Sequence, residues 1–159
     1  MESKYKNYLV CVALLLSALL AACDDDEDST QLDDEIEFNN VSLLGSNERP
    51  AVVTTGGGEM DVVFNELNNT LSYTISWQLG NPADATTAMH FHGPADRDSS
   101  APPVINIEEG FNQGSSGTIS GSTRPLTQTE ENDLKAGRWY VNIHSTTHPN
   151  GELRGNLIP

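Results

Sequence analysis

The chain is strongly acidic, and its length suits one domain with some additional sequence. It has 159 residues, with 8 Lys and Arg against 23 Asp and Glu, which give a formal net charge of −15. This length excludes two large domains. Binding to a phosphate backbone depends on Lys and Arg that displace counterions, so we expect no nucleic-acid partner.

The first 22 residues have the layout of a secretory signal. Lys4 and Lys6 precede an apolar run from Leu9 to Ala22 that only Ser17 interrupts. A run of this length forms a helix of about 21 Å, which is shorter than the hydrocarbon core of about 30 Å. We therefore expect residues 1–22 to be a cleaved signal peptide and not a membrane-spanning helix.

The apolar run ends in Leu20-Ala21-Ala22-Cys23, which resembles the lipobox of bacterial lipoproteins. The motif predicts cleavage before Cys23 and lipidation of this residue, so that the mature protein stays on a membrane without crossing it. An ordinary small-residue cleavage site beside a cysteine stays open as the alternative. Because Cys11 leaves with the signal, lipidation of Cys23 leaves no thiol for a disulfide, a metal site or a nucleophile.

Residues 23–36 are predicted to be an acidic, disordered tether, because they contain too few apolar residues to form a core. The run from Asp24 to Asp28 fails as a calcium loop, since Ser29 stands where Gly is needed and no helices flank it. An acidic run after the lipidated cysteine resembles a surface-display signal of some bacterial lipoproteins. The expected location is the bacterial cell envelope, at the outer membrane, with display on the cell surface as a further option.

From residue 37 to 159 the pattern is that of short strands separated by turns. Apolar and polar residues alternate most regularly from Leu71 to Leu79, and Asn68-Asn69 predicts a hairpin turn before this strand. A capping box at Thr127 and Glu130 predicts one short helix that ends near Gly137. The predicted strands are Ile36–Leu44, Met60–Leu67, Leu71–Leu79, Thr86–His92, Val104–Ile107, Gly117–Gly121, Trp139–His144 and Glu152–Ile158. We therefore expect an all-β fold, an antiparallel β-sandwich or small barrel of about eight strands with one short helix.

The strand pattern also predicts a polar face. His90 and His92 are two residues apart on one strand, so their side chains point the same way, opposite to Met89 and Phe91. The apolar residues of the last two strands lie on one face only if the residue numbers of each opposed pair sum to an even value, as for Asn142 with Arg154. This parity places Tyr140, Asn142, His144, Glu152, Arg154 and Asn156 on one face. With His148 in the connecting loop, the candidate polar cluster is His90, His92, Asn142, His144, His148, Glu152 and Arg154.

Three interpretations of this cluster stay open. His90, His92, His144 and His148 are candidate ligands for zinc or copper, which bind three or four imidazoles. Arg154 is a candidate fork for a ligand carboxylate. Alternatively the histidines bond loop carbonyls, and Arg154 pairs with Glu152. No catalytic residue is predicted, because the chain has neither a Gly-x-Ser-x-Gly elbow nor a phosphate-binding loop after Gly56-Gly57-Gly58.

Four motifs in order resemble the CHRD domain, first described in chordin. They run from Leu44 to Pro50, from His90 to Ala95, from Leu134 to His144 and from His148 to Leu157. The resemblance implies a compact all-β domain that occurs in animal chordin, an antagonist of bone morphogenetic proteins, and in many secreted bacterial proteins. The growth-factor partner is not carried over, because the chain has one copy and no Cys-rich modules. The insert from Asp96 to Pro103 departs from the pattern, and we expect local variation there.

These observations favour a lipid-anchored, cell-envelope domain that acts as a non-catalytic binding or scaffolding module without a cofactor. Its partner would be an envelope protein or an extracellular ligand. The alternative is a His-ligated zinc or copper metalloprotein, since the strand that carries His90, His92 and Gly93 is distantly similar to copper–zinc superoxide dismutase.

Overall fold

The structure is a computed structural model that describes residues 34–107, 110 and 112–159. Its eight strands are β1 Glu35–Leu44, β2 Gly57–Asn65, β3 Thr70–Gln78, β4 Thr86–His92, β5 Pro103–Asn106, β6 Ser116–Ser122, β7 Trp139–Ser145 and β8 Leu153–Leu157. One helix, α1 (Gln128–Lys135), and one 3-10 turn, Gly45–Asn47, complete the fold. The predicted all-β class, with about eight strands and one short helix, is confirmed.

The predicted signal peptide and Cys23 lie outside the described residues, as does most of the acidic tether. Within the part of the chain that the structure describes, no helix is both long and apolar enough to cross a membrane.

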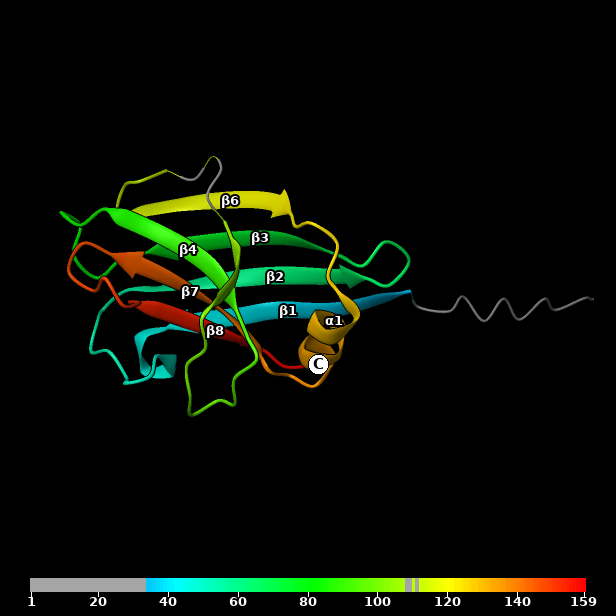
Figure 1. Ribbon diagram of the computed structural model, residues 1–159. Helices are drawn as coiled ribbons and strands as arrows, with labels where there is room; N and C mark the ends of the chain where they lie inside the picture. Colours follow the sequence, from blue (N-terminus) through cyan, green and yellow to red (C-terminus); the bar gives the residue numbers. More distant parts are fainter. Residues whose placement is uncertain (1–33, 108–109, 111) are drawn as a thin grey trace, which may run out of the picture. The chain divides into compact units, whose positions relative to one another are not determined.

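All eight strands belong to one antiparallel sheet in the order β5-β4-β7-β8-β1-β2-β3-β6. The sheet curls on itself, so that β4 and β7 lie across from β2 and β3 (Figure 1). Two contacts join β4 to β3 across the interior. Trp77 Nε1 donates to Thr86 Oγ1 at 2.8 Å, and the rings of Tyr73 and Phe91 meet edge to face at 5.6 Å. The curled sheet therefore encloses one core between its two arms.

Alternation of apolar and polar residues explains how each strand is oriented. On β3, Leu71, Ile75 and Trp77 are buried in the core, while hydroxyls on the outer face pair with β6, as between Thr74 and Ser120 at 2.9 Å. The turn before β3 places Asn69 at a φ of 58°, which Asn tolerates better than most residues. The predicted hairpin is thereby confirmed.

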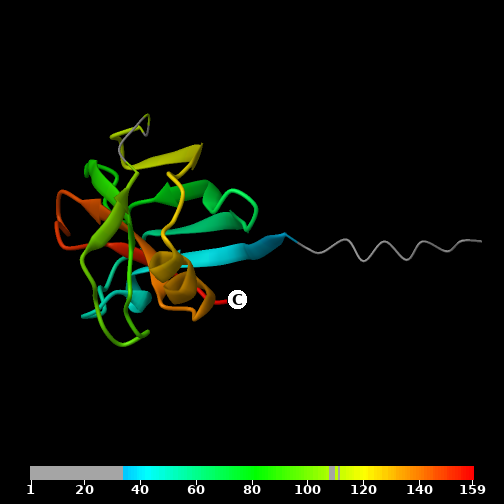
Figure 2. The same ribbon diagram turned by 45° about the vertical axis from the view of Figure 1, so that its right-hand side comes forward.

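Helix α1 closes one end of the core beside the C-terminus (Figure 2). Thr127 and Glu130 form the predicted capping box, and Gly137 follows the helix with a φ of 69°. Leu126 and Leu134 are buried among the core residues. The helix therefore covers apolar side chains at the open end of the sheet.

The register of β4, β7 and β8 sets the two faces of this arm. Asn142 pairs with His90 on β4 and with Arg154 on β8. The residues next to His90 and Asn142 in the sequence point the other way and are buried in the core, namely Met89, Phe91 and Ile143. The predicted parity is therefore confirmed, and the polar side chains of these strands lie on the face that points away from the core.

Candidate functional site

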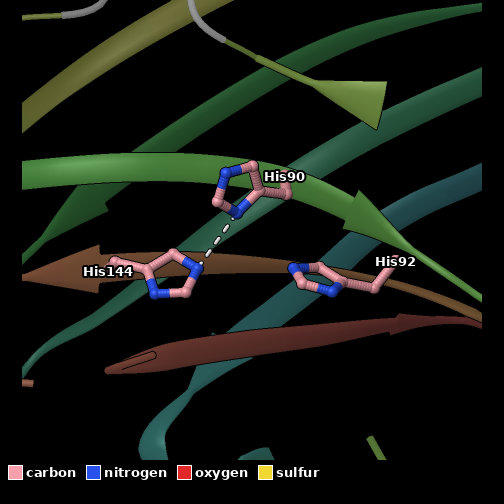
Figure 3. Close-up of side chains that lie close together, drawn as sticks. All are labelled: His90, His92 and His144. Carbon is pink, nitrogen blue, oxygen red and sulfur yellow. Dashed lines mark hydrogen bonds between the residues drawn. The ribbon is translucent and has the colours of Figure 1, made fainter. Parts of the chain in front are cut away.

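Three imidazoles meet on the outer face of the β4–β7 arm. His90 and His92 come from β4, and His144 comes from the neighbouring strand β7 (Figure 3). One ring nitrogen of each lies within 4.8 Å of those of the other two. The ring centroids of His90 and His144 are 4.9 Å apart, and those of His90 and His92 are 5.4 Å apart. We refer to His90, His92 and His144 as the histidine cluster.

Main-chain carbonyls fix the tautomers of two of these rings. His92 Nδ1 lies 2.9 Å from the Ala101 carbonyl oxygen, and His144 Nδ1 lies 2.9 Å from that of Pro149. A carbonyl oxygen only accepts, so each Nδ1 carries the proton, and each Nε2 of a neutral ring keeps a lone pair. His90 Nδ1 then donates to His144 Nε2 at 3.0 Å.

His92 Nε2 is a buried acceptor without a hydrogen bond of normal geometry among the described residues. The His92 side chain is only 5% exposed. Figure 3 shows the outer nitrogen of this ring directed toward His90 and His144. The Asn142 side chain lies near enough to favour the protonated form of His92, but its amide oxygen is also without a normal partner in the described part of the chain.

Two rings of the cluster, those of His90 and His92, are held in the neutral state. Burial, together with the neighbouring His144 and His92, lowers the pKa of His90 to about 4. Burial also lowers the pKa of His92, although the Ala101 carbonyl and Asn142 partly oppose this change. At neutral pH both rings therefore present lone pairs and not positive charge.

Tyr140 on β7 stands between His92 and Arg154. Its ring is stacked on His92, with centroids 4.8 Å apart and planes 7° apart. On the β8 side the Arg154 guanidinium carbon lies 3.6 Å from the centre of the Tyr140 ring. Arg154 is 1% exposed, and it donates to Asn156 Oδ1 at 3.0 Å and to the Ser99 carbonyl at 2.8 Å. Its guanidinium is thus buried and hydrogen-bonded within the protein, and it is not accessible to a ligand carboxylate.

Residues 96–102, which belong to the segment that connects β4 to β5, fold back over this polar face, and we call them the covering loop. The Ala101 N–H donates to the Tyr140 hydroxyl at 3.1 Å, and its carbonyl bonds His92. Ser100 Oγ donates to the Arg49 carbonyl at 3.2 Å. The covering loop therefore explains why polar side chains on an outward face are buried. It falls in the insert where the sequence predicted variation, and its role in the site was not foreseen.

Glu48 lies beside Asn142, the β7 residue that pairs with His90, and sequence reasoning missed Glu48. Burial raises the pKa of Glu48 to about 7, although Arg154, Asn142 and Arg49 act in the opposite direction. Gly151, with a φ of 123°, lets these groups approach, because a Cβ there would lie 2.5 Å from Glu48 Oε1 and 2.6 Å from Asn142 Nδ2. The signal for Glu48 was its place in the Leu44 to Pro50 motif, which the sequence analysis did not connect with the cluster.

Glu152 is buried but serves a different part of the fold. It accepts hydrogen bonds from Thr54 Oγ1 and the Gly80 N–H, both at 2.7 Å. Burial raises its pKa, but hydrogen bonds from Ser145, Gly80 and Thr54, with His148 nearby, bring the pKa below its usual value. Glu152 therefore fastens the β8 hairpin to two loops and does not pair with Arg154.

His148 is separate from the histidine cluster. It lies in the loop between β7 and β8 and lines a cleft of about 240 Å³. One wall of this cleft is formed by Glu48, Arg49, Pro50 and Val52, and the other is formed by residues 147–151. Of the four histidines predicted to meet, the structure thus brings together His90, His92 and His144 and places His148 at this neighbouring cleft.

Comparison with known proteins gives one result. The sequence model of the family described as the CHRD domain matches residues 40–157. No curated protein and no solved structure matches the chain.

Proposed function

Because the chain belongs to the CHRD domain family, we propose that it is a non-catalytic binding module held at the bacterial cell envelope by a lipid on Cys23. The family match over residues 40–157 carries the first part of this proposal. The lipobox-like Leu20-Ala21-Ala22-Cys23 supports the second. The acidic residues that follow Cys23 would repel one another and hold the domain away from the membrane.

The binding surface that we propose is the cleft lined by His148. Both walls come from segments that carry the family motifs, one from the Leu44 to Pro50 motif and one from the start of the last motif. Arg49 remains partly exposed, at 29% of its side chain, although the domain is acidic overall. Arg49 and His148 would donate hydrogen bonds to carboxylate or carbonyl oxygens of an envelope protein or extracellular ligand.

The experiment uses the lipidated protein. A partner captured from envelope extract by cross-linking is identified, purified and titrated against the wild type and against Arg49→Ala and His148→Ala. Each substitution is expected to raise the Kd about 10-fold, because it removes a hydrogen bond to the partner.

Arg97→Ala is the matched control. It removes the same charge from an exposed position on the covering loop, outside the cleft. Its Kd is expected to equal that of the wild type. An unchanged Kd in both cleft variants would rule out the cleft as the binding surface.

A further inference from the structure

We propose that ring nitrogens of His90, His92 and His144 bind a zinc or copper ion on the outer face of β4 and β7. This inference goes beyond the proposed function, because the cleft lined by His148 needs no metal to bind a partner. The ligand atoms are His90 Nδ1, His92 Nε2 and His144 Nε2.

The spacing of these nitrogens is close to that of a metal site. Zinc–imidazole bonds of about 2.0 to 2.1 Å in tetrahedral geometry separate neighbouring ligand nitrogens by about 3.3 Å. His90 Nδ1 and His144 Nε2 are 3.0 Å apart, and one ring nitrogen of each of the three histidines lies within 4.8 Å of those of the other two. Small rotations of the His92 and His90 rings would bring all three to metal-binding distance.

Hydrogen bonds at the edge of the cluster orient the Nε2 lone pairs of His92 and His144 toward the space between the three rings. Metal-binding histidines usually donate their second ring N–H to a carbonyl or carboxylate, which fixes the tautomer and the orientation of the ring. His92 and His144 each do so, to the carbonyls of Ala101 and Pro149. The Nε2 lone pair of His92 is therefore available before any ion binds, whereas that of His144 accepts from His90 Nδ1 until the ion takes its place.

The unpartnered nitrogen of His92 is independent support. Buried polar atoms in proteins nearly always have a hydrogen-bond partner, yet His92 Nε2 has none of normal geometry among the described residues. An ion between the three rings would supply the missing interaction. Without it, this nitrogen is buried with no hydrogen bond of normal geometry, which is unfavourable.

The donor set selects the ion. Three imidazoles with no carboxylate in the group suit zinc or copper, whereas calcium and magnesium require oxygen ligands. For His90 Nδ1 to bind the ion, Nδ1 releases its proton to water and Nε2 of the same ring takes one up, so the imidazole stays neutral. His90 and His144 are only partly buried, so a fourth position stays open toward solvent for water or a further ligand.

The test is a titration of the untagged, lipidated protein, first freed of metal with a chelator, with Zn²⁺ and Cu²⁺ in separate calorimetric experiments. One ion per chain is expected, with a Kd below about 1 μM. His90→Ala and His144→Ala are each expected to raise the Kd at least about 100-fold, because loss of a ligand costs more than the 10–100-fold of a lost supporting group. The spectrum of the copper form should show three nitrogen ligands in the wild type and two in each variant.

His148→Ala is the matched control, since it removes a histidine of the same chain outside the cluster, and its metal affinity should equal that of the wild type. Circular dichroism and thermal unfolding without metal identify a variant that fails to fold, in which case the test rests on the other cluster variant.

The absence of stoichiometric metal binding, or a loss of metal affinity in His148→Ala equal to that in the cluster variants, would overturn the metal site. His148→Ala is expected to lower the affinity for the partner without changing the affinity for the metal ion. The two proposals can therefore fail separately.

Discussion

Glu48 is a buried carboxyl group whose ionisation opposes folding. Its pKa is raised from 4.5 to about 7 by burial. A raised folded-state pKa contributes stability that is fully present below about pH 4.5 and is lost as the pH rises through 7. The shift corresponds to at most about 3 kcal/mol.

We predict that Glu48→Gln removes this contribution. The free energy of unfolding of the wild type should fall between pH 5 and pH 8 by up to about 3 kcal/mol more than that of the variant, because Gln stays neutral. Urea denaturation at the two pH values measures the difference. The same pH dependence in both proteins would show that Glu48 is ionised in the fold throughout this range.

Gly151 is a second residue whose identity the site requires. Its φ of 123° is unfavourable for other residues, and an added Cβ would meet Glu48 and Asn142 at 2.5 and 2.6 Å. We predict that Gly151→Ala lowers the free energy of unfolding by about 2 kcal/mol or more. Gly57→Ala serves as the control, since a Cβ there would meet its nearest atom at an ordinary 3.7 Å. Equal urea midpoints for both variants would contradict this reading.

Among the elements, the covering loop determines how the polar face is buried. The Tyr140 hydroxyl accepts from the Ala101 N–H at 3.1 Å and lies 3.2 Å from the Ala101 carbonyl oxygen. We predict that Tyr140→Phe keeps the ring contacts with His92 and Arg154 but costs about 1 kcal/mol of stability. Hydrogen exchange at the Ala101 amide should accelerate about 5-fold, which is the change in rate that corresponds to this loss of free energy. Tyr73→Phe, on β3, should leave this exchange rate unchanged.

Strand parity was the part of the site that sequence could predict. Side chains alternate with a period of two, so the apolar rows of β4, β7 and β8 fix which residues share the outer face. The contacts of the covering loop could not be predicted in this way. They use the main-chain groups of Ser99 and Ala101. Because every residue type carries these groups, no pattern of side chains predicts the contacts.

The same limit explains His148 and Glu48. The sequence places His148 beside a turn but does not fix the path of the loop, so its separation from the histidine cluster required the fold. Glu48 precedes Pro50 in a segment without strand periodicity, and its burial follows from the approach of the β7–β8 loop at Gly151. Contacts between loops distant in sequence depend on the whole fold and not on local pattern.

For the whole molecule, the proposed arrangement is a curled sheet on an acidic tether. We predict that Cys23→Ser moves the protein from the membrane fraction to the soluble fraction, because the acyl chains that anchor it are lost. Fractionation and the mass of the N-terminal peptide measure this change. Retention of the variant in the membrane fraction would contradict lipid anchoring at Cys23.

The histidine cluster is the feature in which the curled sheet, the strand register and the covering loop come together. Anomalous diffraction from crystals of the zinc-loaded protein tests it most directly. We predict one zinc peak at about 2.0 to 2.1 Å from His90 Nδ1, His92 Nε2 and His144 Nε2. A zinc-loaded crystal with no peak between these three rings, or with zinc bound only at His148, would contradict the account.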